Sequence, residues 1–231
     1  SHLIPNVDDG SRSVVETIEL IKEAQNAGFS DVILTSHYMV DAYEPNTKDI
    51  ILWKEKLQEI LNEEEISVKL HVGMEVYITE NIMDLIKQNK ILTLAGSKYL
   101  LMELPLNTKV KYLENVIFKL LENNIIPIIA HPERYKCVQE DPKIVENLIE
   151  KECLIQSNYG SILGIYGKKA QKTIKHLLKK NLIDFLGTDT HRKNTIYLEI
   201  EKAKKKIKKI VGEEKLQELT TTNAKMILEN N

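Results

Sequence analysis

The chain alternates short apolar runs with longer segments of helical period. Each apolar run is rich in valine, isoleucine and leucine and spans only a few residues, which is typical of strands. Polar positions hardly interrupt these runs, and such continuous apolarity indicates strands buried on both faces, as in a parallel sheet covered by helices. The predicted strands span residues 31–37, 69–77, 99–105, 126–131, 153–158 and 184–191.

Amphipathic helices are predicted between the strands, because apolar positions there repeat every three or four residues. The first helix has recognisable ends, since Ser11 or Ser13 precedes it and Gly28 follows it. The predicted helices span residues 13–28, 48–64, 108–124, 141–152 and 167–181.

This alternation predicts one α/β domain over residues 1–231. No linker rich in glycine, serine or proline divides the chain, and its length suits one large core. A first strand is expected to end just before His2, in an amino terminus that looks truncated, and with the six others it makes about seven βα units. We therefore prefer a TIM-like barrel, with a doubly wound open sheet as the alternative.

Polar side chains that resist burial stand at the carboxyl ends of most of the predicted strands. In a barrel these ends converge on one face, where active sites form. Imidazoles and carboxylates at equivalent points of successive strands predict a site for more than one metal ion. With two residues near the amino terminus, the candidate ligands are His2, Asp9, His37, Glu75, Glu103, His131, Asp189 and His191.

The ligand types narrow the choice of metal. Imidazole mixed with carboxylate, without thiolate, favours manganese, iron or zinc in a reactive site over a structural zinc site built from cysteines. A central carboxylate can bridge two cations about 3.5–4 Å apart, an arrangement used to cleave phosphoesters. Of the two other histidines, His71 is expected to be structural and His176 to be a surface or packing residue on a helix.

Arginine is rare in this chain. Of the 32 basic residues only Arg12, Arg134 and Arg192 are arginines, and each lies near a candidate ligand in sequence. A guanidinium presents a planar fork of donors that matches a phosphate, whereas an ammonium does not. The three arginines therefore favour an anionic, phosphate-like substrate.

Composition excludes several other classes. The net charge of −2 lacks the basic excess of a nucleic-acid-binding protein, and the lysine-rich segment 201–215 is typical of a solvated helix. No apolar run approaches the roughly 20 residues that cross a bilayer. Cys137 and Cys153 lack the spacing of a redox pair, which favours the cytoplasm. Neither is followed six positions later by arginine, so a cysteine-based phosphate loop is excluded.

Six short motifs occur in an order and at separations that resemble the PHP (polymerase and histidinol phosphatase) superfamily. They are DDG, TSH, GMEVY, LMELP, AHPERY and GTDTH. Within the superfamily the chain is most similar to the bacterial manganese-dependent protein-tyrosine phosphatases of capsule and exopolysaccharide operons, the CpsB/YwqE type. The resemblance covers essentially the whole chain, down to TTNAKMIL near its end.

The resemblance implies a distorted (β/α)7 barrel that holds three metal ions, Mn²⁺ by preference, with iron, zinc or magnesium as alternatives. The implied ligands of the first ion are His2, Glu75, Asp189 and a histidine expected directly before Ser1. Glu75 would bridge to the second ion, whose other ligands are Glu103 and His131. The implied ligands of the third ion are Asp9, His37 and His191.

The implied activity is hydrolysis of a phosphotyrosine protein, the tyrosine-rich tail of a bacterial tyrosine kinase that controls capsule or exopolysaccharide synthesis. Arg134 and Arg192 would stabilise charge on the phosphate, and His191 would assist the leaving group. Arg12 and Tyr38 are further candidates for substrate contact. An aromatic and apolar rim is expected from Tyr38, Met39, Tyr43, Tyr77, Tyr135 and Tyr159.

Two other functions remain open at this point. One is a small-molecule phosphatase of the same superfamily, acting on a compound such as histidinol phosphate. The other is a non-catalytic, metal-binding regulator of a kinase, which the three arginines disfavour because a scaffold needs no phosphate clamp. No nucleic-acid partner and no membrane insertion are expected, and assembly into a homo-oligomer is left open.

Overall fold

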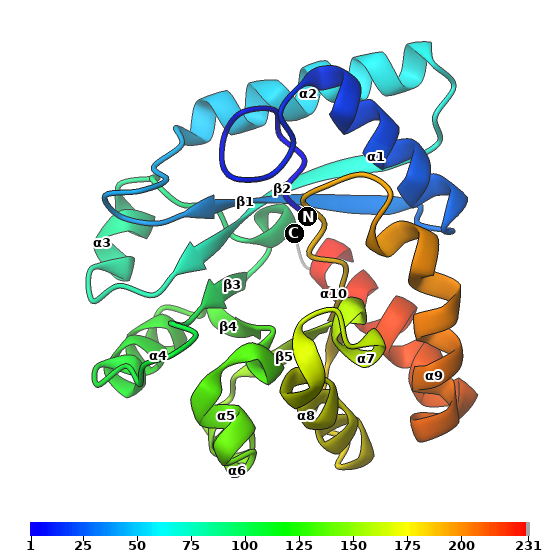
Figure 1. Cartoon of the computed structure of the whole chain (residues 1–231). Coiled ribbons are helices and arrows are strands. Elements are labelled where there is room, and N and C mark those ends of the chain that lie inside the picture. Colours follow the sequence, from blue (N-terminus) through cyan, green and yellow to red (C-terminus); the bar gives the residue numbers. More distant parts are fainter. Residues whose placement is uncertain (230–231) are drawn as a thin grey trace.

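A computed structural model describes residues 1–229 of the chain. Six parallel strands form one sheet and follow one another in chain order. They are β1 (Asp31–Tyr38), β2 (Lys69–Tyr77), β3 (Tyr99–Glu103), β4 (Ile126–Ala130), β5 (Leu154–Asn158) and β6 (Phe185–Gly187). The sheet curls into a half-barrel, which Figure 1 shows with β1 at one side and β5 near the other.

Most of the helices surround the curled sheet on its outer side, and α10 lies within the curl (Figure 1). The helices are α1 (Val14–Asn26), α2 (Thr47–Glu63), α3 (Ile82–Lys87), α4 (Leu113–Glu122), α5 (Lys136–Glu140), α6 (Lys143–Glu150), α7 (Tyr159–Leu163), α8 (Gly167–Lys179), α9 (Ile196–Gln217) and α10 (Asn223–Glu229). Three single turns complete the chain, namely η1 (Leu94–Gly96), η2 (Pro132–Arg134) and η3 (Glu218–Thr222). Both η3 and α10 pack at the amino ends of the strands. The turn η3 contacts β6, and α10 contacts η1, which lies just before β3.

The predicted alternation of strands and helices is confirmed, and the strand order favours a barrel. A doubly wound sheet reverses its order at a switch point, whereas this sheet runs from β1 to β6 without reversal. At the amino terminus Ser1 O accepts from Thr35 N (2.9 Å) and His2 N donates to Thr190 O (3.0 Å). These two residues bridge β1 and the segment after β6, so the count of seven βα units stays a prediction.

Three strands end earlier than the sequence predicts, and at two of them the backbone explains why. The strand predicted over 126–131 stops at Ala130, and the one predicted over 184–191 stops at Gly187. His131 (φ 33°) and Asp189 (φ 50°) have left-handed backbones, which cost roughly 1–2 kcal/mol in a residue with a Cβ and do not continue a strand. Both are candidate ligands, so each turn directs a ligand at the carboxyl edge of the sheet.

Local sequence sets the helix starts, and apolar burial holds the helices to the sheet. Ser13 Oγ accepts from Glu16 N at the start of α1, so Ser13 and not Ser11 is the N-cap. Leu34 of β1 and Leu57 of α2 are fully buried in one continuous core.

Among residues 1–229, no helix combines the length and the apolar character needed to cross a membrane.

The loop between Ser1 and α1 folds back on the amino terminus. Ser11 N donates to His2 O (3.0 Å) and Asn6 N donates to Ser11 O (2.9 Å). This close approach depends on Gly10, where an added Cβ would overlap the carbonyl oxygen of His2. The glycine of the DDG motif is therefore required by the backbone that places His2.

We expect Gly10→Ala to destabilise the fold more than the control Gly28→Ala. Gly28 has a left-handed backbone (φ 88°) with open space where a side chain would project, so its substitution should cost only about 1–2 kcal/mol. At Gly10 the added methyl meets rigid backbone, so the loop itself must shift. Denaturant unfolding of the three proteins measures the difference, and equal losses would contradict the argument.

Candidate metal centre and active site

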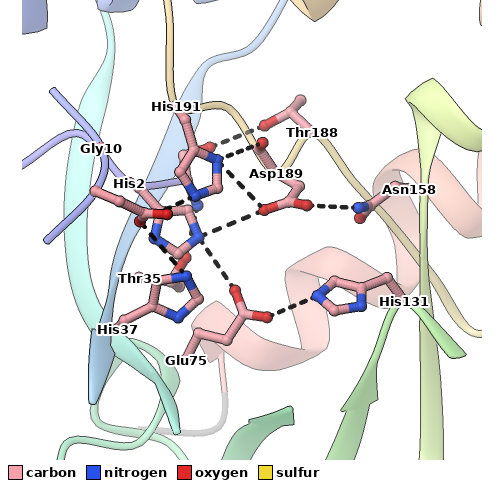
Figure 2. A network of polar contacts seen from close by, with 12 residues as sticks. His2, Gly10, Thr35, His37, Glu75, His131, Asn158, Thr188, Asp189 and His191 are labelled. Atoms are coloured by element: carbon pink, nitrogen blue, oxygen red, sulfur yellow. Dashed lines mark hydrogen bonds and ion pairs between the residues drawn. The ribbon is translucent and has the colours of Figure 1, made fainter. Parts of the chain in front are cut away.

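The eight candidate ligands converge at the carboxyl edge of the sheet. Their donor atoms form three overlapping groups, and within each group all the atoms lie within 4.8 Å of one another. The groups are His2–Asp9–His37–His191, His2–Glu75–Asp189 and Glu75–Glu103–His131. Figure 2 shows much of this cluster, joined by a line of contacts from His2 through Glu75 to His131.

Glu75 lies at the centre of the cluster. The parallel pairing of β1 with β2 places it opposite His37. Glu75 is 3% exposed, with Oε2 3.1 Å from His2 Nε2 and Oε1 3.0 Å from His131 Nε2. Burial opposes its ionisation, yet the hydrogen bonds from these two imidazoles hold the pKa of Glu75 well below its ordinary value. Its two oxygens therefore face two different ligand groups, as a bridging carboxylate requires.

Asp8 orients His2 and was missed by sequence reasoning, which selected only its neighbour Asp9. Asp8 Oδ2 lies 2.9 Å from His2 Nδ1 and accepts from His37 N (2.8 Å), while Oδ1 accepts from Gly10 N (2.9 Å). Burial opposes the charge, but the contact with His2 lowers the pKa of Asp8 to about 2. A ligating histidine usually needs an acceptor for its other nitrogen, so the adjacent acids could have suggested this role.

Asp9 belongs to a more open group beside His37 and His191. Its side chain is 52% exposed, and Oδ1 lies 3.4 Å from His191 Nε2 and 3.7 Å from His37 Nε2. His191 stacks on His2 with 4.0 Å between ring centroids. This group is thus the outermost of the three and the one that solvent reaches most easily.

The donor set fits divalent cations. Burial and the nearby charge of Glu75 raise the pKa of Glu103 to about 7, and the positive charges of His131 and Arg134 offset this rise only in part. Among residues 1–229, the ring nitrogens His37 Nδ1 and His131 Nδ1 are buried without a hydrogen-bond partner. Unpaired ring nitrogens close to several carboxylates are suitable ligands for manganese, iron, zinc or magnesium.

Arg134 reaches the cluster from η2. Its Nη1 donates to Asp189 Oδ2 (2.9 Å), and its guanidinium carbon lies 4.5 Å from the centre of the Tyr166 ring. It lines a cavity of about 240 Å³ together with several candidate ligands. The guanidinium donors of Arg134 thus lie beside the candidate metal ligands. A phosphate in this cavity could bind the guanidinium and the cations together.

The other two arginines lie differently. Arg192 Nη1 donates to the carbonyl oxygens of Gly10 and His191, the latter at 2.8 Å, which ties the DDG loop to the segment after β6. Arg12 is exposed, and within the part of the chain that the structure describes its side chain makes no hydrogen bond or ion pair. Substrate contact by Arg12 and Arg192 therefore stays a prediction.

The expected aromatic rim needs correction. Tyr38, Tyr135 and Tyr159 are at most 2% exposed and belong to the hydrophobic core, so they cannot contact a substrate at the rim. Tyr38 follows His37 on β1, and consecutive strand residues point to opposite faces. Of the expected rim residues, Met39 and Tyr43 line the cavity.

The other two histidines lie outside the cluster. His71 Nε2 is 2.9 Å from Asp31 Oδ1, at the amino end of β1 and far from the ligand edge. His176 is exposed on α8. These positions agree with the expectation.

The curled parallel sheet, its imidazole–carboxylate cluster and the adjacent arginine together define a class of protein. They are the features of a metal-dependent hydrolase whose active site lies at the carboxyl ends of its strands and suits phosphate esters. Comparison with known proteins identifies the family.

The chain belongs to the CpsB/CapC family, described as capsular polysaccharide synthesis, which matches residues 1–229. It is 36% identical over 194 residues to CapC of Staphylococcus aureus, covering 83% of this chain and 75% of that protein. It is 30% identical over 229 residues to the tyrosine-protein phosphatase YwqE of Bacillus subtilis, covering 99% of this chain and 90% of that protein. The resemblance seen in the motifs is confirmed.

Solved structures agree with this assignment. The chain matches a structure from a study of Bacillus subtilis YwqE and Streptococcus pneumoniae CpsB, described as metal-dependent tyrosine phosphatases, with a TM-score of 0.94 and 30% identity over 100% of this chain and 93% of that one. A histidinol phosphate phosphatase from Lactococcus lactis shares the fold, with a TM-score of 0.53 and 18% identity over 84% of this chain and 86% of that one.

Glu75→Gln should lower the number of Mn²⁺ ions bound per chain more than Glu103→Gln does. Glu75 belongs to two of the three ligand groups, whereas Glu103 belongs to one. Metal analysis after gel filtration measures the stoichiometry, with Glu44→Gln as a control outside the groups. Equal losses in the two ligand variants would refute the bridging position of Glu75.

Proposed function

We propose that this chain is a metal-dependent tyrosine-protein phosphatase that acts in capsule or exopolysaccharide synthesis. The observation that carries the proposal is one cavity lined both by candidate ligands from all three groups and by Arg134. The names and activities of the family members support the same reaction. The substrate class, the metal and the roles of single residues are parts of this proposal.

Three ions would be held by three sets of ligands, with Mn²⁺ preferred. The first set is His2, Glu75 and Asp189, the second is Glu75, Glu103 and His131, and the third is Asp9, His37 and His191. Divalent cations in such a site supply Lewis acidity, which polarises phosphoryl oxygens and makes water a nucleophile near neutral pH.

The protein's own groups bind and orient the phosphate. Arg134 has one guanidinium nitrogen on Asp189, and its other guanidinium nitrogens have no hydrogen-bond partner within residues 1–229, so they can donate to equatorial phosphoryl oxygens. A tyrosine leaving group has a conjugate-acid pKa of about 10 and needs little protonation. His191 has Nδ1 3.0 Å from Asp189 O, which leaves only Nε2 for either ligation or proton transfer.

The walls of the cavity favour an aryl phosphate over histidinol phosphate. Met39 and Tyr43 offer apolar and aromatic surface beside the ligands, and the segment is held by Met39 N donating to Tyr43 O (2.7 Å). The acids considered for an ammonium group, Asp41 and Glu44, do not line the cavity. Glu44 already accepts from Asp41 N at 2.9 Å.

The natural substrate is proposed to be the tyrosine-rich tail of a bacterial tyrosine kinase, in the cytoplasm. An extended tail suits a cavity at the open edge of the half-barrel, and the family's link to capsular polysaccharide synthesis supports such a partner. The cytoplasmic location is supported by the free thiols of Cys137 and Cys153.

The deciding experiment compares three substrates on one Mn²⁺-loaded preparation. We expect a phosphotyrosine peptide to give a higher kcat/KM than the matched phosphoserine peptide or histidinol phosphate. Chelation should abolish turnover, and Mn²⁺ should restore it better than Mg²⁺ because imidazole ligands suit the softer ion. A preference for histidinol phosphate would favour the small-molecule phosphatase, and an inactive but metal-loaded protein would favour the regulator.

Arg134→Ala should reduce kcat by about 10²–10³ at saturating Mn²⁺, since one preorganised charge stabiliser is lost. Arg134→Lys should recover only part of the activity, because the ammonium cannot hold Asp189 and a phosphate with the same fork. Steady-state kinetics with metal analysis measure both effects. Wild-type turnover in the alanine variant would remove Arg134 from the mechanism.

Tyr43→Ala should reduce the preference for phosphotyrosine over phosphoserine peptides. The ring lines the cavity, and a good aromatic pair contributes about 0.5–1.5 kcal/mol, which corresponds to roughly 2- to 12-fold in kcat/KM. Tyr77→Ala is the matched control, because Tyr77 follows Glu75 closely in sequence but does not line the cavity. A preference that changes equally in both variants would contradict the role of Tyr43.

A further inference from the structure

The carboxylate of Asp189 divides its two oxygens between two surroundings. Oδ1 faces the candidate ligands, at 3.5 Å from His2 Nε2 and 3.7 Å from His191 Nδ1. Oδ2 faces away from these imidazoles and accepts hydrogen bonds from other side chains. The orientation of this one carboxylate therefore decides which oxygen is offered to a cation.

Three donors converge on Oδ2 of Asp189. Asn158 Nδ2 donates at 2.7 Å, Arg134 Nη1 at 2.9 Å and Tyr166 Oη at 3.3 Å. Figure 2 shows the contact from Asn158, on the side of Asp189 opposite His2. An oxygen with three donors is saturated, which leaves Oδ1 as the oxygen that faces the candidate ligands.

Asn158 is itself fixed at both ends. Its Oδ1 accepts from Gln156 Nε2 (2.8 Å), which orients the amide so that Nδ2 faces Asp189. Its backbone N donates to Glu133 Oε1 (2.9 Å), and both Asn158 and Glu133 are fully buried. Because Glu133 directly precedes Arg134, the same contact ties the backbone of Asn158 to the side chain of the residue next to the arginine.

Tyr166 holds the arginine from a second direction. Its ring lies beneath the guanidinium of Arg134, with 4.5 Å from the guanidinium carbon to the ring centre, and its hydroxyl donates to the same carboxylate oxygen as the arginine. A stacked ring restricts the tilt of the guanidinium plane and adds cation–π attraction. Tyr166 thus fixes the plane in which the remaining arginine donors lie.

We propose that Asn158 and Tyr166 are positioning residues. Asn158 orients Asp189 so that Oδ1 faces the metal-ligating imidazoles, and Tyr166 fixes the guanidinium of Arg134 for phosphate. This proposal deepens the proposed phosphatase function and rests on it. Neither residue needs to touch the substrate, so each acts through the side chain that it holds.

The role of Asn158 is tested by Mn²⁺ titration of the metal-free protein. Asn158→Ala should weaken the binding of one ion by about 10- to 100-fold, the usual effect of losing a partner of a metal ligand. The matched control is Asn223→Ala, since Asn223 is also buried and donates from Nδ2 to Asp184 O (2.8 Å), at the other end of β6. Wild-type Mn²⁺ affinity in Asn158→Ala, or an equal loss in Asn223→Ala, would overturn this role.

The role of Tyr166 is tested by competitive inhibition with inorganic phosphate in a double-mutant cycle. Tyr166→Leu should raise the inhibition constant by about 3- to 10-fold, within the range of a desolvated cation–π contact, and leave Mn²⁺ affinity within twofold. Tyr166→Phe keeps the ring and should recover most of the phosphate affinity. In an Arg134→Ala background, Tyr166→Leu should have no further effect.

An additive effect of Tyr166→Leu in the Arg134→Ala background would overturn the proposal, because it would show that the tyrosine does not act through the arginine. The same holds if Tyr166→Phe is as impaired as Tyr166→Leu. A small aryl phosphate serves as the reporter substrate in these assays. Failure of the wild-type protein on phosphotyrosine peptides would instead count against the proposed function and would leave these affinities measurable.

Discussion

The site depends on a charged carboxylate buried between two imidazoles. Removing a carboxylate from water is costly unless it is paired and hydrogen-bonded, and Glu75 meets this condition through His2 and His131. One partner comes from the amino terminus and the other follows β4, so the pairing needs the amino terminus and the carboxyl end of β4 in place. The register of β1 with β2 then brings His37 alongside. Fold and ligand cluster are therefore specified by the same contacts.

Strain at the ligand edge is held by the rigid sheet beneath it. His131 and Asp189 both have left-handed backbones, and such residues persist only where surrounding contacts fix them. At Asp189 these contacts include three donors on Oδ2, and at His131 the ring nitrogen bonds Glu75. Because the strands below are almost fully buried, the edge can hold these turns without relaxing. The fold thus fixes the backbone positions of these two candidate ligands.

Sequence predicted the parts of the site that follow from strand periodicity and strand ends. Glu75 and His37 could be predicted because the carboxyl ends of parallel strands meet at one edge. The predicted rim was wrong at Tyr38, because the residue after His37 in the strand points to the opposite face and enters the core. Asp8, Asn158 and Tyr166 were not predicted, because their roles arise from contacts between segments far apart in the chain or from the choice between adjacent acids.

At one position of this lysine-rich chain, the structure explains why an arginine is used. Arg134 must donate to Asp189, stack on Tyr166 and still present donors to the cavity. A guanidinium does all three because it is planar and carries five N–H groups in a fixed fork. An ammonium has no plane that could stack on the ring. It can also rotate about an N–H group held by Asp189, so the directions of its other N–H groups are not fixed. The carboxylate that would bind a cation therefore also orients the group that would bind the phosphate, which links metal binding to substrate binding through a single side chain.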